Sequence, residues 1–243
     1  MMGVDGFGWL VAGVIVAGLV RGFSGFGTAM IYLPIAGQVL SPVAAITTLI
    51  VIDLIGPLPN VPRALREAVL PDVARLGIGL VLGLPVGVAV LLAVAPEVFR
   101  YAVSGATLVM LGLLLAGWRY AGPLRAPLVL ATGGASGLLG GAAGLAGPPV
   151  ILVYMASPLR PAAIRANILL FLLVTDIAML GLYALWDVFD RSVAMAGLVL
   201  AVPYLLANVA GAAMFRPEAE RTYRRIAYAI IAGSALLGLP LWD

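Results

Sequence analysis

Apolar runs separated by glycine, proline or charged residues follow one another along almost the whole chain. A helix that spans a bilayer needs roughly 20 mostly apolar residues, and most of these runs approach that length. They lie at 7–21, 28–39, 42–59, 73–95, 98–118, 126–143, 147–156, 162–186, 190–214 and 223–241. The pattern predicts an all-α fold, a polytopic bundle of membrane helices in which 28–39 and 147–156 are unusually short segments.

Each of the two short segments directly follows a glycine-rich break. The first break reads Arg21-Gly22-Phe23-Ser24-Gly25-Phe26-Gly27-Thr28, and the second runs from Gly137 to Gly147-Pro148-Pro149. Non-helical backbone at membrane depth is tolerated only where it is buried in protein or lines a wet cavity. The breaks therefore predict two broken or re-entrant helices. The alternative is that the glycines only permit close helix packing.

The two halves of the chain carry the same features in the same order. Each half has a span, a glycine-rich break, a short segment that ends near a proline turn, a long span with one acid, and two further spans. The turns are Ser41-Pro42 and Arg160-Pro161, and the acids are Asp53 and Asp176. We predict one membrane domain built from two repeats of about five segments, residues 1–120 and 121–243.

The arginines divide unevenly between alternate loops of this plan. One side receives Arg100 and Arg191, and the other receives Arg63, Arg66, Arg75, Arg119, Arg125, Arg160, Arg165, Arg216, Arg221, Arg224 and Arg225. Arginine-rich loops stay in the cytoplasm, so both termini are predicted outside. Because five segments is an odd number, the second repeat starts on the opposite side from the first, and the repeats are predicted to be inverted.

Composition restricts the class of protein further. The chain is 63% hydrophobic and 10% charged, with a mean hydropathy of +1.14, so the bilayer must act as its solvent. It has no cysteine and no histidine, which excludes thiolate chemistry and the usual zinc sites. We expect no cofactor, no metal and no enzyme activity. The net charge of +3 is too dispersed to indicate nucleic-acid binding, and the first apolar run is predicted to be a retained span.

The breaks are the predicted substrate site. Helix N-termini present N–H groups and a partial positive charge, and therefore bind oxyanions. Arg21 beside the first break is interpreted either as a planar donor to an oxyanion or as an anchor at the cytoplasmic mouth. The candidate substrate-binding residues are Arg21, Ser24, Gly25, Gly27, Thr28, Thr47, Thr48, Gly144, Gly147 and Asn167. Arg165 is interpreted as an interfacial anchor.

Asp53 and Asp176 are the acids that lie well inside apolar segments. Burial disfavours a charged carboxylate, so either residue is a candidate proton carrier, which would make protons the coupling ion. The alternative is that each is a static partner of buried arginine or backbone. The tryptophans, Trp9, Trp118, Trp186 and Trp242, lie near predicted span ends and are typical of an aromatic belt.

The break at 22–27 followed by Pro34, together with the run Gly137 to Pro149 and Arg165-Ala166-Asn167, resembles the TauE/SafE family of permeases. The resemblance extends over nearly the whole chain. The first break departs from the commoner family pattern because it ends in Gly27-Thr28-Ala29-Met30 instead of a glycine triplet, and the second contains Leu145-Ala146-Gly147. The departures concern the substrate more than the family.

The resemblance implies a secondary transporter of sulfite or of an organosulfonate such as sulfoacetate, in a bacterial cytoplasmic membrane. Alternating access between inverted repeats, coupled to protons or to the membrane potential, is the predicted mechanism. A passive anion channel and a permease for carboxylates or other small anions are the alternatives. The expected partners are the small anion and the lipid bilayer, and a homo-oligomer is compatible with the sequence.

Overall fold

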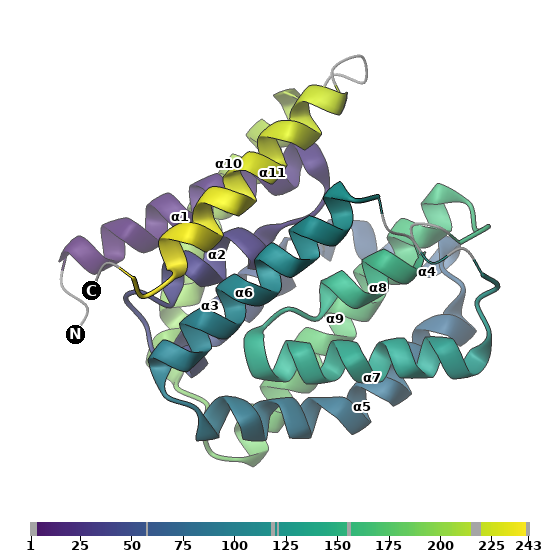
Figure 1. Cartoon of the computed structure of the whole chain (residues 1–243), viewed down its shortest axis with the longest axis horizontal. Helices are drawn as coiled ribbons and strands as arrows, with labels where there is room; N and C mark the ends of the chain where they lie inside the picture. The colour runs from purple at the N-terminus through teal and green to yellow at the C-terminus, as the bar shows by residue number, and fades with distance from the viewer. Residues whose placement is uncertain are drawn as a thin grey trace. The chain divides into compact units, whose positions relative to one another are not determined.

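The computed structural model describes residues 4–56, 58–117, 120, 122–154, 157–214 and 220–241. The described residues form eleven α-helices and one 3-10 helix, with no strand among them (Figure 1). The predicted all-α class is confirmed. Some residues named above, Trp118, Arg119, Arg216 and Trp242, lie outside the described residues, as does the side chain of Arg221.

The chain divides into two compact units, each of which we describe separately. Unit 1 comprises Met1–Ile52, Ala95–Gly112 and Asp190–Asp243. It holds α1 (Val4–Ser24), α2 (Thr28–Ala36), most of α3 (Pro42–Ile55), α6 (Pro96–Leu115), α10 (Arg191–Met214) and α11 (Glu220–Gly238). Unit 2 comprises Asp53–Val94 and Leu113–Phe189. It holds the 3-10 helix η1 (Leu58–Asn60), α4 (Val61–Glu67), α5 (Leu70–Ala93), α7 (Ala126–Ala143), α8 (Gly147–Tyr154) and α9 (Pro161–Leu185).

Within the part of the chain that the structure describes, six helices are long and apolar enough to cross a membrane: α1, α5, α6, α7, α9 and α10. The predicted segment 42–59 is shorter than expected, because α3 ends at Ile55 and Gly56 precedes a proline, which disfavours helical backbone. The first two turns of α11 carry Glu220, Arg221, Arg224 and Arg225, so its apolar part is short. Leu82 on α5 and Leu206 on α10 are 73% and 69% exposed, as expected of side chains that face lipid.

In unit 1, α1 and α10 run parallel with their backbones in contact. Gly18 lies against Tyr204 and Ala207, and Gly22 lies against Asn208 and Ala212. A Cβ added at Gly18 would lie 2.6 Å from the Tyr204 carbonyl oxygen, and one at Gly22 would collide with the Asn208 carbonyl oxygen. Only glycine permits this approach.

The segment α2 doubles back along α1. Gly13 lies against Ile35, and Gly6 lies near Val39, so the chain has returned to the beginning of α1 by residue 39. The end of α11 reaches the same place, because the Gln38 amide donates to the Leu237 carbonyl oxygen at 3.0 Å. Val4 and Leu241 therefore lie at the same end of unit 1, as the positions of the two ends in Figure 1 show.

In unit 2, α5 and α7 form an equivalent parallel pair, side by side in Figure 1. Glycines meet backbone along the whole pair: Gly79, Gly83 and Gly87 on α5, and Gly133, Gly137 and Gly141 on α7. The helix α9 also runs parallel to α5, because the Val69 N–H donates to the Asn167 side chain while Gly77 lies near Val174.

These directions determine the path of residues 144–160. Since α7 and α9 both begin where α5 begins, the chain must return between them, through α8 and the residues that follow it. Residues 126–154 therefore reverse direction within the unit. The merging of α7 and α8 into a single crossing is excluded.

Two glycines of α1 make backbone contacts that correspond to those of two glycines of α7. Gly22 meets the carbonyl oxygen of Asn208, the carbonyl carbon of Gly211 and the nitrogen of Ala212; Gly141 meets the same three atoms of Leu84, Gly87 and Val88. Gly18 with Tyr204 likewise matches Gly137 with Leu80. Residues of α1 thus match residues of α7 found 119 positions later, and residues of α5 match residues of α10 found 124 positions later.

This correspondence links helices of the two predicted repeats. Unit 1 pairs the first helix of repeat 1 with the fourth segment of repeat 2, and unit 2 makes the reciprocal pair. The compact units therefore cut across the division at residue 120, which remains a prediction.

Candidate functional site

The first break is a turn of positive-φ glycines between α1 and α2. The Gly25 N–H donates to the Arg21 carbonyl oxygen at 2.8 Å, and Gly25 and Gly27 have φ values of 81° and 100°. These left-handed conformations favour glycine over other residues. The predicted helix break is present, and α2 begins at Thr28, at the first residue of the predicted short segment.

Polar side chains from three parts of the chain meet at this break. The Arg21 guanidinium donates to the Thr28 hydroxyl at 3.3 Å, and that hydroxyl lies 3.0 Å from the Tyr204 hydroxyl. Arg21 is half-buried and Thr28 is buried. Ser24 stays local, because its hydroxyl donates to backbone carbonyl oxygens of Val20 and Phe26. The structure thus brings together Arg21 and Thr28, and adds a tyrosine that the sequence analysis did not single out.

The backbone at this break is suited to an anion. Gly27 provides no side-chain cap for α2, and Thr28, Ala29 and Met30 each carry a backbone N–H in the first turn. Unsatisfied N–H groups give a helix N-terminus its partial positive charge. Arg21 lies in the last turn of α1, where its positive charge offsets the partial negative charge of that helix end. The helix N-terminus and the arginine both favour a negatively charged group at the break.

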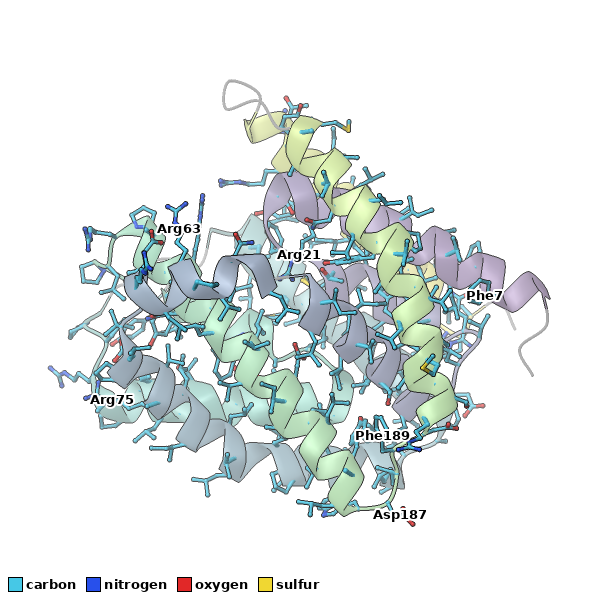
Figure 2. The ribbon with its side chains drawn as sticks, turned by 180° about the vertical axis from the view of Figure 1, so that it is seen from behind. Phe7, Arg21, Arg63, Arg75, Asp187 and Phe189 are labelled. Atoms are coloured by element: carbon cyan, nitrogen blue, oxygen red, sulfur yellow. The ribbon has the colours of Figure 1, made fainter. Side chains whose placement is uncertain are left out.

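The break lies toward the end of unit 1 opposite the termini. Figure 2 shows Arg21 and Phe7 at opposite ends of α1. Gly27 lies beside Ile231 of α11, seven residues past Arg224, which is roughly 10 Å along the helix at 1.5 Å per residue. The site therefore lies about two helical turns further along α11 than Arg224, toward the middle of unit 1.

The second break has the same backbone plan and different chemistry. Gly144 has a φ of 69° and ends α7, and α8 begins with Gly147-Pro148-Pro149. The two prolines carry no N–H, so the first turn of α8 offers fewer donors than that of α2. The positions equivalent to Arg21, Thr28 and Tyr204 are Gly140, Gly147 and Leu80.

The remaining substrate candidates lie on α3 and α9 and make hydrogen bonds within their own unit. The Thr47 hydroxyl donates to the Val43 carbonyl oxygen, and the Thr48 hydroxyl lies 2.8 Å from the Tyr32 hydroxyl. Asn167 occupies the position equivalent to Thr48 and accepts the Val69 N–H at 2.7 Å. These residues are not brought to the Arg21 cluster by any of these hydrogen bonds, so their role in substrate binding stays a prediction.

Among the acids, Asp53 lies near the end of α3 and Asp176 lies in the middle of α9, both partly buried. The charged residue that the structure buries most among those described is Asp72, 6% exposed, which pairs with Arg75 at 2.9 Å. The sequence analysis missed Asp72 because it stands in the first turn of its helix and resembles a loop residue. Arg165 is exposed, as expected of an interfacial anchor.

The described tryptophans lie where the sequence analysis placed them. Trp9 and Trp186 are 41% and 38% exposed near helix ends, which fits the aromatic belt. Within the described ranges, no cluster of three or more acidic, histidine or cysteine residues could hold a metal ion.

A protein-family model described as sulfite exporter TauE/SafE matches residues 10–237. The chain belongs to the TauE/SafE family. Membership makes it a multi-pass membrane transporter and not an enzyme. A curated member from Cupriavidus necator, a probable sulfite/organosulfonate exporter TauE, is 28% identical over 232 residues, which cover 89% of this chain and 88% of that protein. No solved structure matches the chain significantly.

Proposed function

We propose that this TauE/SafE protein is a secondary transporter that exports sulfite or a small organosulfonate across the bacterial cytoplasmic membrane. Family membership supports the transport class, and the name of the Cupriavidus relative supports the substrate class. The observation that carries the site is the half-buried Arg21 beside the uncapped N-terminus of α2. Both features favour a group with several negatively charged oxygens.

The donors at the first break match such an anion. A guanidinium presents its N–H groups as a planar fork that binds two oxygens at once. The first-turn N–H groups of α2 can take a third oxygen, as helix N-termini do with phosphate and sulfate. Sulfite and sulfonates each present three oxygens around one sulfur, so both kinds of donor can be used together.

The charge distribution supports inverted repeats. In unit 1, α1 and α10 begin at the end that holds Arg100 and Arg191 and finish at the end that holds Arg224. In unit 2, α5 and α7 begin at the end where Figure 2 shows Arg63 and Arg75, opposite Asp187. If arginine-rich ends are cytoplasmic, α1 runs inward and α7 runs outward. Inverted repeats of this kind support alternating access.

Proton coupling is proposed to involve Asp53 or Asp176. The test is sulfite flux into proteoliposomes with and without a pH gradient, in the wild type and in the Asp53→Asn and Asp176→Asn variants. We expect the gradient to drive wild-type flux and at least one variant to lose that dependence. Flux that ignores the gradient in the wild type would contradict proton coupling, and absence of any sulfite or sulfonate flux would contradict the proposed substrate.

A further inference from the structure

Tyr204 reaches the first break from a distant part of the chain. It lies on α10, 176 positions after Thr28, and its hydroxyl lies 3.0 Å from the Thr28 hydroxyl. Tyr204 is 2% exposed. A buried hydroxyl among apolar helices costs free energy unless it is hydrogen-bonded, so its presence here needs a reason beyond filling space.

The second unit shows what packing alone requires at this position. Gly18 lies against the Tyr204 carbonyl oxygen as Gly137 lies against that of Leu80, and Leu80 is fully buried. An apolar side chain therefore satisfies the same helix pair. At this pair of equivalent positions, the tyrosine hydroxyl occurs in the unit that also carries Arg21 and Thr28.

We infer that Tyr204 is a positioning residue for the anion site: it holds the Thr28 hydroxyl, and through it orients the Arg21 guanidinium toward the break. This inference rests on the proposed function of the site. The long arginine side chain has many rotamers, and restricting them before the anion arrives lowers the entropy cost of binding. The hydrogen bond from Arg21 to Thr28 at 3.3 Å is the restriction, and Tyr204 fixes its acceptor.

The arrangement also explains why Thr28 is the residue at the start of α2. Its hydroxyl can accept from Arg21 and still form the second hydrogen bond with Tyr204, because a hydroxyl has one donor and two acceptor positions. Gly147, the equivalent residue at the start of α8, has no side chain and cannot form two such hydrogen bonds. The positioning system is thus confined to the first break.

The test compares Tyr204→Phe with Tyr183→Phe in the full-length protein. Tyr183 is the control: it is fully buried on α9, and its hydroxyl makes no hydrogen bond within the described residues. Sulfite uptake into proteoliposomes gives the KM and maximal rate of each variant. We expect Tyr204→Phe to raise the KM about tenfold with little change in maximal rate, and Tyr183→Phe to change the KM less than twofold.

A second measurement separates positioning from general stability. If Tyr204 acts through Thr28, the two substitutions should not be additive, so Tyr204→Phe should have no further effect on KM in a Thr28→Val background. Equal effects of Tyr204→Phe and Tyr183→Phe, or full additivity with Thr28→Val, would overturn the inference while wild-type sulfite uptake still supported the proposed function. Absence of wild-type uptake would instead overturn the proposed function itself.

Discussion

The two glycine-rich breaks have one backbone plan and two sets of side chains. Gly22 and Gly141 make matching contacts with α10 and α5, and a short helix follows each break at Thr28 and Gly147. Around the first break lie a guanidinium and two hydroxyls; the equivalent positions of the second are Gly140, Gly147 and Leu80. The comparison teaches that the glycines determine the architecture in both halves, whereas the chemistry for an anion is concentrated in one.

The difference extends to the backbone itself. The first turn of α2 is Thr28-Ala29-Met30, and that of α8 is Gly147-Pro148-Pro149. Proline suits the first turn of a helix geometrically but removes an N–H. The second break therefore keeps the shape of an anion site while losing donors. We interpret it as the structural counterpart of the first.

The largest expected effect is from removal of the arginine. Arg21→Ala should weaken sulfite binding on the order of 100-fold. Each charge-assisted hydrogen bond contributes roughly 1.5–3 kcal/mol, and a bidentate arginine makes two such bonds. Sulfite-dependent thermal stabilisation of the purified protein measures the loss. The matched control is Arg165→Ala, an exposed arginine at the start of α9, which should bind sulfite as the wild type does. Equal losses in both variants would mean that only net charge matters.

The shared architecture predicts that a glycine-to-alanine substitution at either break lowers the stability of the protein by a similar amount. Gly22→Ala and Gly141→Ala should each destabilise the protein by about 1–3 kcal/mol, the usual cost of overpacking, because the new Cβ would meet backbone of the neighbouring helix. Thermal unfolding in detergent measures this. Gly105→Ala and Gly181→Ala are the controls, since a Cβ at either position meets nothing within 4 Å. A Gly141→Ala protein as stable as the wild type would contradict the matching backbone contacts of Gly22 and Gly141.

A proline transferred between the breaks should make the first resemble the second. Ala29→Pro copies Pro148 and removes one N–H from the first turn of α2, where proline is tolerated. We expect sulfite binding to weaken about tenfold while the unfolding temperature changes little. An unaltered affinity in a folded Ala29→Pro protein would show that the α2 N–H groups do not bind the anion.

The smallest effect is expected from the reverse change. Pro148→Ala restores an N–H at the second break, where no arginine or hydroxyl lies at the equivalent positions. The affinity for sulfite should stay within about twofold of the wild type, since one added backbone donor without a partner charge contributes little. Isothermal titration of the two proteins measures the difference. A large gain would assign a binding role to the second break.

The starts of the short helices were predictable from sequence because glycine and proline act locally. Residues 28 and 147 begin α2 and α8 as the breaks indicated. The pairing of α1 with α10 and of α7 with α5 was not predictable, because it depends on contacts between glycines far apart in the chain. Nothing in the sequence around Gly22 or Gly211 indicates that these two helical glycines contact each other.

For the site, Arg21 and Thr28 were identified because they adjoin a break. Tyr204 was not, because its position in α10 carries no local signal. Its counterpart is a leucine, so even an alignment of the two halves would have hidden it. Tyr204 is identified by its contact with Gly18, which matches the contact of Leu80 with Gly137, and not by a shared residue type.

The most direct test of the central claim is the location of the anion itself. Selenite has the same shape and charge as sulfite and scatters anomalously at the selenium edge, so crystals of the protein with selenite would show where the anion binds. We predict an anomalous peak beside the Arg21 guanidinium and the N-terminus of α2. A peak at Gly144–Gly147 instead, or an anion bound away from both breaks, would contradict the account.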